Sequence, residues 1–179
     1  MSGLFVGRFQ PFHRGHLELV RSVQRATGGR PLLLVIGSAE QAFTWENPFT
    51  AGERFEMISG ALAEAGIPGV TIVPVADIGR HALWVRYLEG LLPRFDRVYT
   101  HNPLTRLLFE RAGYAVESPP MYHRATLEGA KVRVALAAGR GATALLPPSV
   151  ARYLAELKAR ERLLELRPSA GGRPRGAGT

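Results

Sequence analysis

Two histidines lie three residues apart in the segment 7–16, which reads GRFQPFHRGH. The segment follows an apolar run at 4–6 and precedes an amphipathic stretch at 17–26, which together predict a strand, a tight loop and the start of a helix. Backbone N–H groups at a helix N-terminus attract anions, and glycines let a ligand approach the main chain closely. Histidine and arginine side chains add hydrogen-bond donors for phosphate oxygens. The segment therefore predicts a binding site for a nucleotide triphosphate.

Apolar runs and helical patterns alternate along the chain, and this order must position the histidines. The runs typical of strands lie at 4–6, 32–36, 70–75, 98–99 and 115–116. The helical patterns lie at 17–26, 51–65, 82–91, 104–111, 131–138 and 149–166. Strands that alternate with helices form βαβ units and hence a mostly parallel sheet. We therefore predict an α/β fold, a single Rossmann-like doubly wound parallel sheet with C-terminal helices.

Several helix boundaries carry their own signals. Thr50 and Glu53 fit a capping box, in which the threonine caps the helix and the glutamate reaches back to it. Asn102 before Pro103 places a good N-cap ahead of a proline at the first helical position. Glycines suited to ending a helix follow two of the patterns, at Gly66 and Gly113.

In an open α/β sheet, ligands bind beyond the carboxyl ends of the strands, where the strand order reverses. The loops after the first four predicted strands should therefore line one cleft. These loops cover 7–16, 37–47, 76–84 and 100–102, and they hold many of the chain's unusual polar and aromatic residues. We expect the nucleotide site at this edge of the sheet.

The segment 7–16 closely resembles the first signature of the H-x-G-H nucleotidylyltransferases, and the chain is most similar to the archaeal-type nicotinamide-nucleotide adenylyltransferases. Further matching segments follow in the family's order and approximate spacing, at 36–39, 47–54, 82–85, 102–104 and 145–147. Together they span roughly residues 3–155. The resemblance implies an enzyme that joins ATP and nicotinamide (or nicotinate) mononucleotide to give NAD (or deamido-NAD) and pyrophosphate.

The implied reaction is attack by the mononucleotide's phosphate on the α-phosphorus of ATP. Because both reactants bring their own oxygens, catalysis consists of positioning and charge stabilisation. The resemblance assigns catalytic roles to His13, His16 and Arg133, with His16 nearest the transferring group. It implies ATP-binding roles for Gly7, Arg8, Phe9, Gln10, His13, Gly15, His16, Asn102, Gly129, Lys131 and Arg133. Mg²⁺ is expected as the cofactor, held mainly by the nucleotide phosphates and water, with no metal ligand from the protein.

The same resemblance implies a second set of residues for the mononucleotide, namely Gly37, Ser38, Asn47, Asp77 and Trp84. The indole of Trp84 would lie against the nicotinamide ring by stacking and cation–π attraction; the alternative is a tryptophan in the core between sheet and helix. Asp77 either contacts a ribose or caps the following helix. Asn102 either lines the adenosine side or serves only as an N-cap.

Two segments depart from the family's pattern. Glu46 stands where the family usually has an arginine, and Asn47 stands where it has an aspartate. In the last motif, Glu128 and Ala130 replace hydroxyl residues, while Gly129 and Arg133 are kept. Carboxylates near a triphosphate repel it. One alternative is therefore a nucleotide-binding paralogue with weak or no transferase activity, and another is an H-x-G-H nucleotidylyltransferase with a different acceptor.

Composition sets the remaining bounds. The chain has 179 residues, 46% of them hydrophobic, a formal net charge of +8 and no cysteine. The length predicts one domain, at 1–166, which the resemblance identifies as a nucleotidylyltransferase domain. The Gly, Pro and Arg residues of 167–179 predict a disordered basic tail. We expect a cytoplasmic location, and the lack of cysteine excludes disulfides and thiolate metal sites. No apolar run approaches the roughly 20 residues of a membrane span, so we expect no membrane partner.

The positive charge is nearly all arginine, because Lys131 and Lys158 are the only lysines. The arginines are scattered and no basic–aromatic motif accompanies them, so we expect no nucleic-acid partner. The apolar stripe in 149–166 should pack on the domain or on a second subunit, and members of the family often form homo-oligomers, so we expect one here. The predicted partners are ATP and nicotinamide mononucleotide.

Overall fold

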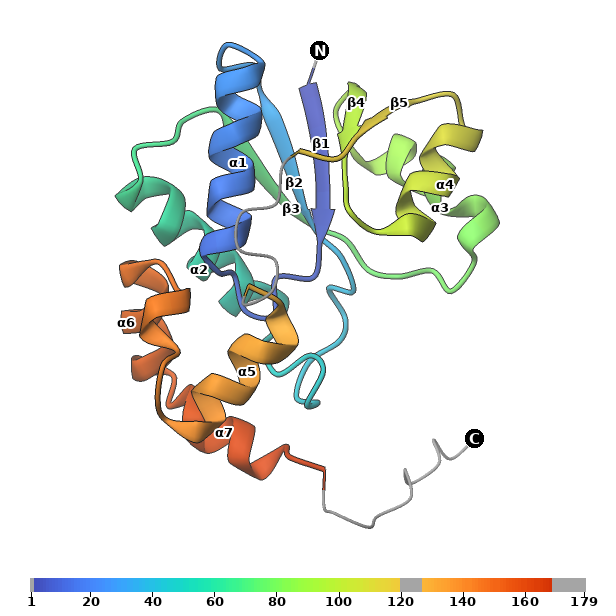
Figure 1. The fold of residues 1–179 in the computed structure, drawn as a ribbon. Helices are drawn as coiled ribbons and strands as arrows, with labels where there is room; N and C mark the ends of the chain where they lie inside the picture. Colours follow the sequence, from blue (N-terminus) through green and yellow to red (C-terminus); the bar gives the residue numbers. More distant parts are fainter. Residues whose placement is uncertain (1, 120–126, 169–179) are drawn as a thin grey trace.

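The computed structural model describes residues 2–119 and 127–168. Within them, five parallel strands form one sheet in the order β3-β2-β1-β4-β5 (Figure 1). The strands are β1 (Ser2–Gly7), β2 (Leu32–Ile36), β3 (Val70–Pro74), β4 (Phe95–Tyr99) and β5 (Ala115–Glu117). The chain winds outward from β1 to β3 and then returns to place β4 on the other side of β1. The predicted doubly wound parallel sheet is confirmed, with its strand order reversing between β1 and β4.

The helices follow the predicted order with two differences. They are α1 (Arg14–Ala26), α2 (Ala51–Glu64), α3 (His81–Leu91), α4 (Pro103–Arg111), α5 (Gly129–Ala138), α6 (Pro148–Glu156) and α7 (Ala159–Glu165). Helix α1 begins at Arg14, so His16 lies in its first turn and not in the preceding loop. The single helix expected over 149–166 is wrong, because Lys158 adopts a left-handed backbone conformation (φ +50°) that separates α6 from α7.

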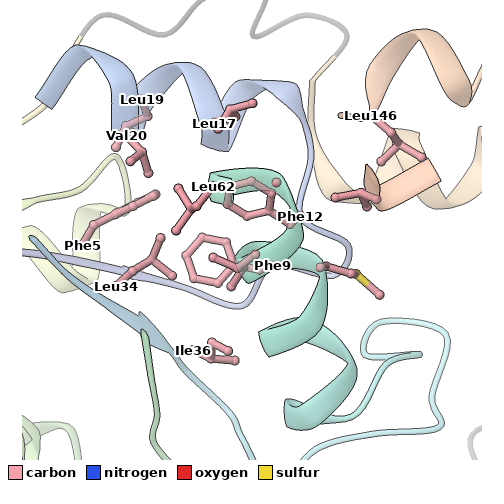
Figure 2. Close-up of a cluster of buried hydrophobic side chains, with 14 of the residues drawn as sticks. Phe5, Phe9, Phe12, Leu17, Leu19, Val20, Leu34, Ile36, Leu62 and Leu146 are labelled. Atoms are coloured by element: carbon pink, nitrogen blue, oxygen red, sulfur yellow. The ribbon is translucent and has the colours of Figure 1, made fainter. Parts of the chain in front are cut away.

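Helices cover both faces of the sheet. Because alternate residues of a strand point to opposite sides, each strand supplies side chains to both of the resulting cores. In β2, Leu34 and Ile36 belong to a cluster that also contains Phe5 and the inward faces of α1 and α2 (Figure 2). Leu33 and Val35 belong to the other cluster, which is closed by α3 and α4. Figure 1 shows these two helix pairs on opposite sides of the sheet.

The C-terminal helices extend the first of these clusters. Val150, Leu154 and Ala159 are buried in it, α6 packs against α2, and α7 packs against α5 and α6. Most of the apolar stripe of 149–166 therefore packs on this domain, whereas Leu164 is 44% exposed. The homo-oligomer stays a prediction. Residues 169–179 of the predicted tail lie outside the described residues.

The predicted helix boundaries at the site edge are confirmed. The Thr50 hydroxyl accepts a hydrogen bond from the Glu53 backbone N–H at 3.2 Å, and the Glu53 carboxylate accepts one from the Thr50 N–H at 2.9 Å. Asn102 caps α4 by accepting from the Thr105 N–H at 3.0 Å. The helix-ending glycines adopt left-handed conformations, at Gly66 and Gly113. Over 2–119 and 127–168, no helix has the length and apolar character that crossing a bilayer requires.

Candidate active site

Two cavities open at the carboxyl edge of the sheet, on either side of the point where the strand order reverses. The smaller cavity, about 300 Å³, lies between the loop after β1, the segment after β4 and the start of α5. The larger cavity, about 700 Å³, lies between the loops after β1, β2 and β3 and the starts of α3 and α4. Both are lined by Val6, Gly7 and Asn102. The edge therefore offers two adjoining spaces that meet at the end of β1.

The two histidines of the sequence motif lie together at the start of α1 and line the smaller cavity. His13 is the N-cap residue, and its ring stacks on that of His16 with centroids 3.6 Å apart. The backbone N–H of His13 donates to Nδ1 of His16 at 3.2 Å. A neutral imidazole that accepts at Nδ1 carries its proton on Nε2. His16 therefore has an Nε2–H donor for a phosphate oxygen.

Both imidazoles are neutral at neutral pH without a ligand. Burial lowers the pKa of His13 to about 4. Burial, together with the neighbouring His13, lowers the pKa of His16 well below its ordinary value. Nδ1 of His13 is buried without a hydrogen-bond partner among the described residues. An anion that enters this cavity would favour the charged forms and raise both pKa values.

Two glycines let neighbouring segments close around the histidines. A Cβ atom at Gly15 would lie 3.2 Å from the His13 ring and 3.2 Å from Cβ of Leu127. A Cβ atom at Gly129 would lie 3.3 Å from the backbone oxygen of Gln10. Side chains at these positions would therefore push the start of α5 away from the histidine loop.

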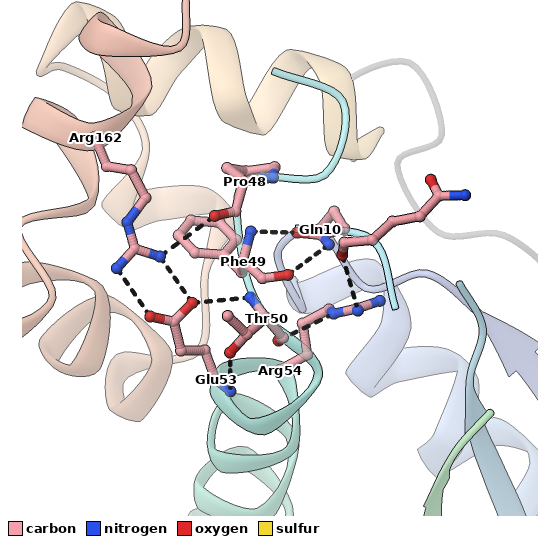
Figure 3. Close-up of polar contacts among 8 residues, drawn as sticks. Gln10, Pro48, Phe49, Thr50, Glu53, Arg54 and Arg162 are labelled. Carbon is pink, nitrogen blue, oxygen red and sulfur yellow. Dashed lines mark hydrogen bonds and ion pairs between the residues drawn. The ribbon is translucent and has the colours of Figure 1, made fainter. Parts of the chain in front are cut away.

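A buried arginine that the sequence pattern left without a role organises the loops beneath the larger cavity. Arg54 of α2 has no exposed surface. Its guanidinium donates to the backbone oxygens of Arg8 at 3.1 Å, Gly37 at 2.9 Å, Ser38 at 3.1 Å and Thr50 at 3.1 Å. One side chain thus ties the loop after β1 to the loop after β2. Figure 3 shows its bond to Thr50. In the sequence, only its position in the matching segment 47–54 indicates that Arg54 belongs to the site.

The arginines of this edge lack close anionic partners. Arg133 donates to the backbone oxygen of Gln10 at 2.8 Å, and its Nε is buried without a partner in the described part of the chain. Burial lowers the pKa of both Arg54 and Arg133, and the charge of Arg8 lowers each further. Among residues 2–119 and 127–168, none of these three arginines has a carboxylate oxygen within 4.0 Å. Such a cluster favours an anionic ligand.

The larger cavity is lined by four of the five residues expected for the mononucleotide, Gly37, Ser38, Asp77 and Trp84. The Ser38 hydroxyl donates to the Asp77 carboxylate at 2.6 Å. Trp84 lines the cavity and also packs edge-on against Phe109, with ring centroids 5.7 Å apart. It therefore belongs to the packing between sheet and helix and still reaches the cavity, and its contact with a nicotinamide ring stays a prediction.

Two further alternatives are decided by helix caps. Helix α3 begins at His81 with Arg80 as its N-cap and no side-chain cap bond, so the expectation that Asp77 caps this helix is wrong. Asn102 caps α4 and also lines both cavities. Asn102 can therefore serve as an N-cap and still face a bound nucleotide.

Phe9 and Gln10 are buried and line neither cavity. Phe9 is buried in a left-handed conformation (φ +52°), with its ring edge-on to His16 at 4.9 Å. The Gln10 amide donates to the Phe49 backbone oxygen at 2.8 Å and accepts from the Phe49 N–H at 3.0 Å. These side chains hold the histidine loop in place.

Three other expected site residues also line neither cavity. Asn47 is buried, and its amide donates to the Gln41 side chain at 2.9 Å. Nζ of Lys131 lies 3.6 Å from Oε2 of Glu128, a residue that lines the smaller cavity. Arg133 is buried on α5 and donates to the backbone oxygen of Gln10. The remaining expected ATP-binding residues line one or both cavities: Gly7, Arg8, His13, Gly15, His16, Asn102 and Gly129.

Histidines outside the sequence motif also reach the site. His101 follows β4 and lines the smaller cavity with His13 and His16, and His81 lines the larger one. In the sequence, His101 lies directly before Asn102 at the end of a predicted strand, and this position indicates that it reaches the site edge. Glu46 is exposed, and its charge raises the pKa of Arg133, so this carboxylate acts on the arginine cluster.

The Cytidylyltransferase-like family model matches residues 4–135. The nicotinamide-nucleotide adenylyltransferase of Picrophilus torridus is 40% identical over 169 residues, which cover 94% of this chain and 99% of the relative. The protein of the same name from Pyrococcus horikoshii is 42% identical, with 92% of this chain and 88% of the relative covered.

Solved structures share the fold. A bifunctional NMN adenylyltransferase/ADP ribose pyrophosphatase from Francisella tularensis superposes with a TM-score of 0.75 at 20% sequence identity, covering 92% of this chain and 52% of that chain. The same enzyme complexed with AMP and a manganese ion gives a TM-score of 0.73 at 20% identity, covering 92% of this chain and 51% of that chain.

Proposed function

Because the chain belongs to the Cytidylyltransferase-like family and, within it, to the nicotinamide-nucleotide adenylyltransferases, we propose that it joins ATP to nicotinamide or nicotinate mononucleotide. The products are NAD or deamido-NAD and pyrophosphate. The observation that carries this proposal for the site is the pair of cavities that meet at Val6, Gly7 and Asn102. Two nucleotides bound in adjoining cavities can place their reacting phosphates next to each other.

In the proposed arrangement, ATP occupies the smaller cavity and the mononucleotide the larger. An oxygen of the mononucleotide's phosphate forms a bond to the α-phosphorus of ATP, the bond from that phosphorus to the β-phosphate oxygen breaks, and pyrophosphate leaves. His16 donates from Nε2 to a phosphate oxygen, and His13 and the backbone N–H groups at the starts of α1 and α5 stabilise the charge that develops. The buried Arg54 and Arg133 add positive potential from behind the loops.

The larger cavity suits a mononucleotide. The face of Trp84 offers stacking to the pyridine ring, and a pyridinium gains cation–π attraction. The Ser38–Asp77 pair presents hydroxyl and carboxylate groups to which ribose hydroxyls can hydrogen-bond. Arg8, which was expected to bind ATP, is exposed and lines this larger cavity and not the smaller one, so in this proposal it binds the mononucleotide's phosphate.

Mg²⁺ enters in this proposal bound to ATP. The cation prefers an octahedral shell of oxygens and keeps several waters, so triphosphate oxygens and water supply most of its ligands. Within the described residues no group of three or more His, Asp or Glu side chains could hold a metal ion. The chain's own task is to hold the phosphates that carry the cation.

The proposal is tested by incubating the purified full chain with ATP, Mg²⁺ and each mononucleotide, followed by chromatography of the nucleotides and a pyrophosphate assay. The expected result is dinucleotide and pyrophosphate in equal amounts. Binding of ATP without any dinucleotide from either mononucleotide would contradict the proposal and favour a binding protein.

A further inference from the structure

A side chain of the last helix reaches the loop that precedes α2. The Arg162 guanidinium contacts both oxygens of Glu53, at 2.7 and 2.8 Å, and donates to the backbone oxygen of Pro48 at 3.3 Å (Figure 3). It also lies 5.4 Å from the ring centre of Phe43 and 5.8 Å from that of Phe49. We refer to these five residues as the Arg162 clamp.

The clamp continues into the histidine loop. Phe49 exchanges two backbone–side-chain hydrogen bonds with Gln10, at 2.8 and 3.0 Å. The backbone oxygen of Gln10 in turn accepts from Arg133 of α5 at 2.8 Å. Gln10 lies three residues before His13, so a displacement of Phe49 would move the loop that ends at the histidine pair.

The other side of α7 packs on the helix that carries Arg133. Ala159 and Leu163 are buried, and α7 lies against α5. Helix α7 therefore contacts both segments that close on the histidine loop, the loop before α2 through Arg162 and α5 through apolar packing. The family model ends at residue 135, well before α7.

The contacts of Arg162 restrict the movement of its side chain and of the groups that it binds. The side chains of Arg162 and Glu53 are only 19% and 15% exposed. A bidentate arginine–carboxylate pair fixes the orientation of both partners, and contact with two aromatic rings restricts the guanidinium further. Glu53 also accepts from the Thr50 N–H, so the same carboxylate fixes the start of α2.

We propose that Arg162 is a positioning residue for the phosphate site: the clamp holds the loop before α2 and, through Gln10, the histidine loop in the alignment that phosphate transfer needs. The catalytic part of this inference rests on the proposed function; the ordering of the loop does not.

The chain offers a matched control. Arg152 of α6 also pairs with a glutamate of α2, with Nη2 3.2 Å from Oε1 of Glu64, but at the far end of that helix. The side chain of Arg152 is 67% exposed, and the hydrogen bond it makes within residues 2–119 and 127–168 goes to Glu64. Arg152→Met therefore removes a link between a C-terminal helix and α2 without touching the clamp.

The test compares Arg162→Met, Arg162→Lys and Arg152→Met by steady-state kinetics at a temperature where each is folded. We expect Arg162→Met to lower kcat about ten- to a hundredfold, since small misplacements of catalytic groups have such effects. Arg162→Lys, which keeps the charge, should recover part of this loss, and Arg152→Met should match the wild type. A role confined to stability would lower the melting temperature and leave kcat unchanged, which would overturn the proposal.

A second readout does not depend on turnover. Trp45 lies within the loop before α2, and the Trp84→Phe background leaves it as the only tryptophan. In that background we expect Arg162→Met to lower the fluorescence anisotropy of Trp45, and Arg152→Met to leave it unchanged. Equal anisotropy in both variants would overturn the clamp even if the wild type proves to be active. If the wild type makes no dinucleotide, the proposed function is wrong, and the anisotropy of Trp45 still tests whether Arg162 orders the loop.

If Arg162→Met does not fold, Glu53→Gln replaces it in both measurements. The amide oxygen can still accept from Thr50, whereas the ion pair with Arg162 is lost. Wild-type kcat and Trp45 anisotropy in this variant would contradict the proposal.

Discussion

The rings of His13 and His16 stack with centroids 3.6 Å apart, and the backbone N–H of His13 donates to Nδ1 of His16. This single bond selects the tautomer of His16 and leaves Nε2–H for a ligand. Burial lowers the pKa of both imidazoles, so both rings are neutral at neutral pH in the ligand-free chain.

The first prediction concerns the donor on His16. Removing one donor to a developing charge commonly lowers kcat by about 10²–10³-fold, so we expect His16→Leu to lose activity on this scale. His16→Gln should retain more, because its amide N–H can approach the position of Nε2. Steady-state kinetics at saturating ATP measures both variants, and wild-type kcat in His16→Leu would contradict the assigned role.

The second prediction concerns stability and pH. The pKa of His13 is about 4 in the folded protein and 6.5 ordinarily, so between these values the unfolded chain binds more protons. The stabilisation is complete above pH 6.5 and is lost as the pH falls toward 4, and His16 acts in the same direction. For His13 the loss should reach about 3 kcal/mol, since each pKa unit is worth about 1.4 kcal/mol.

Urea unfolding of the ligand-free protein over this pH range measures the loss. Carboxylates also titrate there, so His13→Asn serves as the reference. The free energy of unfolding should fall less steeply toward acid pH in the variant, and parallel curves would refute the assignment.

The third prediction concerns Arg54. Its replacement by methionine leaves several partly or fully buried backbone oxygens without this donor, each at a cost of up to about 1–3 kcal/mol. We expect Arg54→Met to be destabilised by about 3 kcal/mol or more, and Arg54→Lys by less. Chemical denaturation checks this, and an unchanged unfolding midpoint in Arg54→Met would show that the loops hold together without it.

The fourth prediction concerns Trp84. Stacking of a base on an aromatic side chain is worth about 1–3 kcal/mol, so Trp84→Ala should raise the KM for the mononucleotide about tenfold or more. The KM for ATP should change little, and Trp84→Phe should retain much of the affinity because it keeps a ring. An equal rise in the KM for ATP and the KM for the mononucleotide would contradict stacking on the mononucleotide and leave Trp84 with a role in core packing alone.

The fifth prediction concerns Glu46. Its charge acts on Arg133 and is exposed to solvent, so its effect on ATP should be small and sensitive to salt. We expect Glu46→Gln to lower the KM for ATP about fivefold or less at low ionic strength. A KM that does not depend on this residue at any salt concentration would show that Glu46 faces away from the phosphates.

Much of the fold follows from local patterns. The buried run 32–36 and the capping residues Thr50 and Asn102 set elements whose bounds agree with the structure to within a few residues. The helix over 149–166 failed because an apolar stripe at helical spacing continues across Lys158, whose left-handed conformation has no signal of its own.

The site was less predictable from the sequence, because motif residues divide between those that face a ligand and those that support them. Gln10 and Asn47 belong to matching segments, yet their side chains bind other parts of the protein. Arg54 supports two loops through backbone oxygens, and no residue spacing reveals such contacts in advance. His101 reaches the smaller cavity only because β4 lies beside β1.

The central claim is that the adjoining cavities bring the phosphate of a mononucleotide to the α-phosphorus of ATP. The most direct measurement incubates the full chain with Mg²⁺, nicotinamide mononucleotide and ATP labelled at the α-phosphorus, and follows the label by chromatography. The account predicts that the label passes into the dinucleotide while the released pyrophosphate is unlabelled. Label that remains in ATP, or that appears only in AMP or ADP, would contradict it.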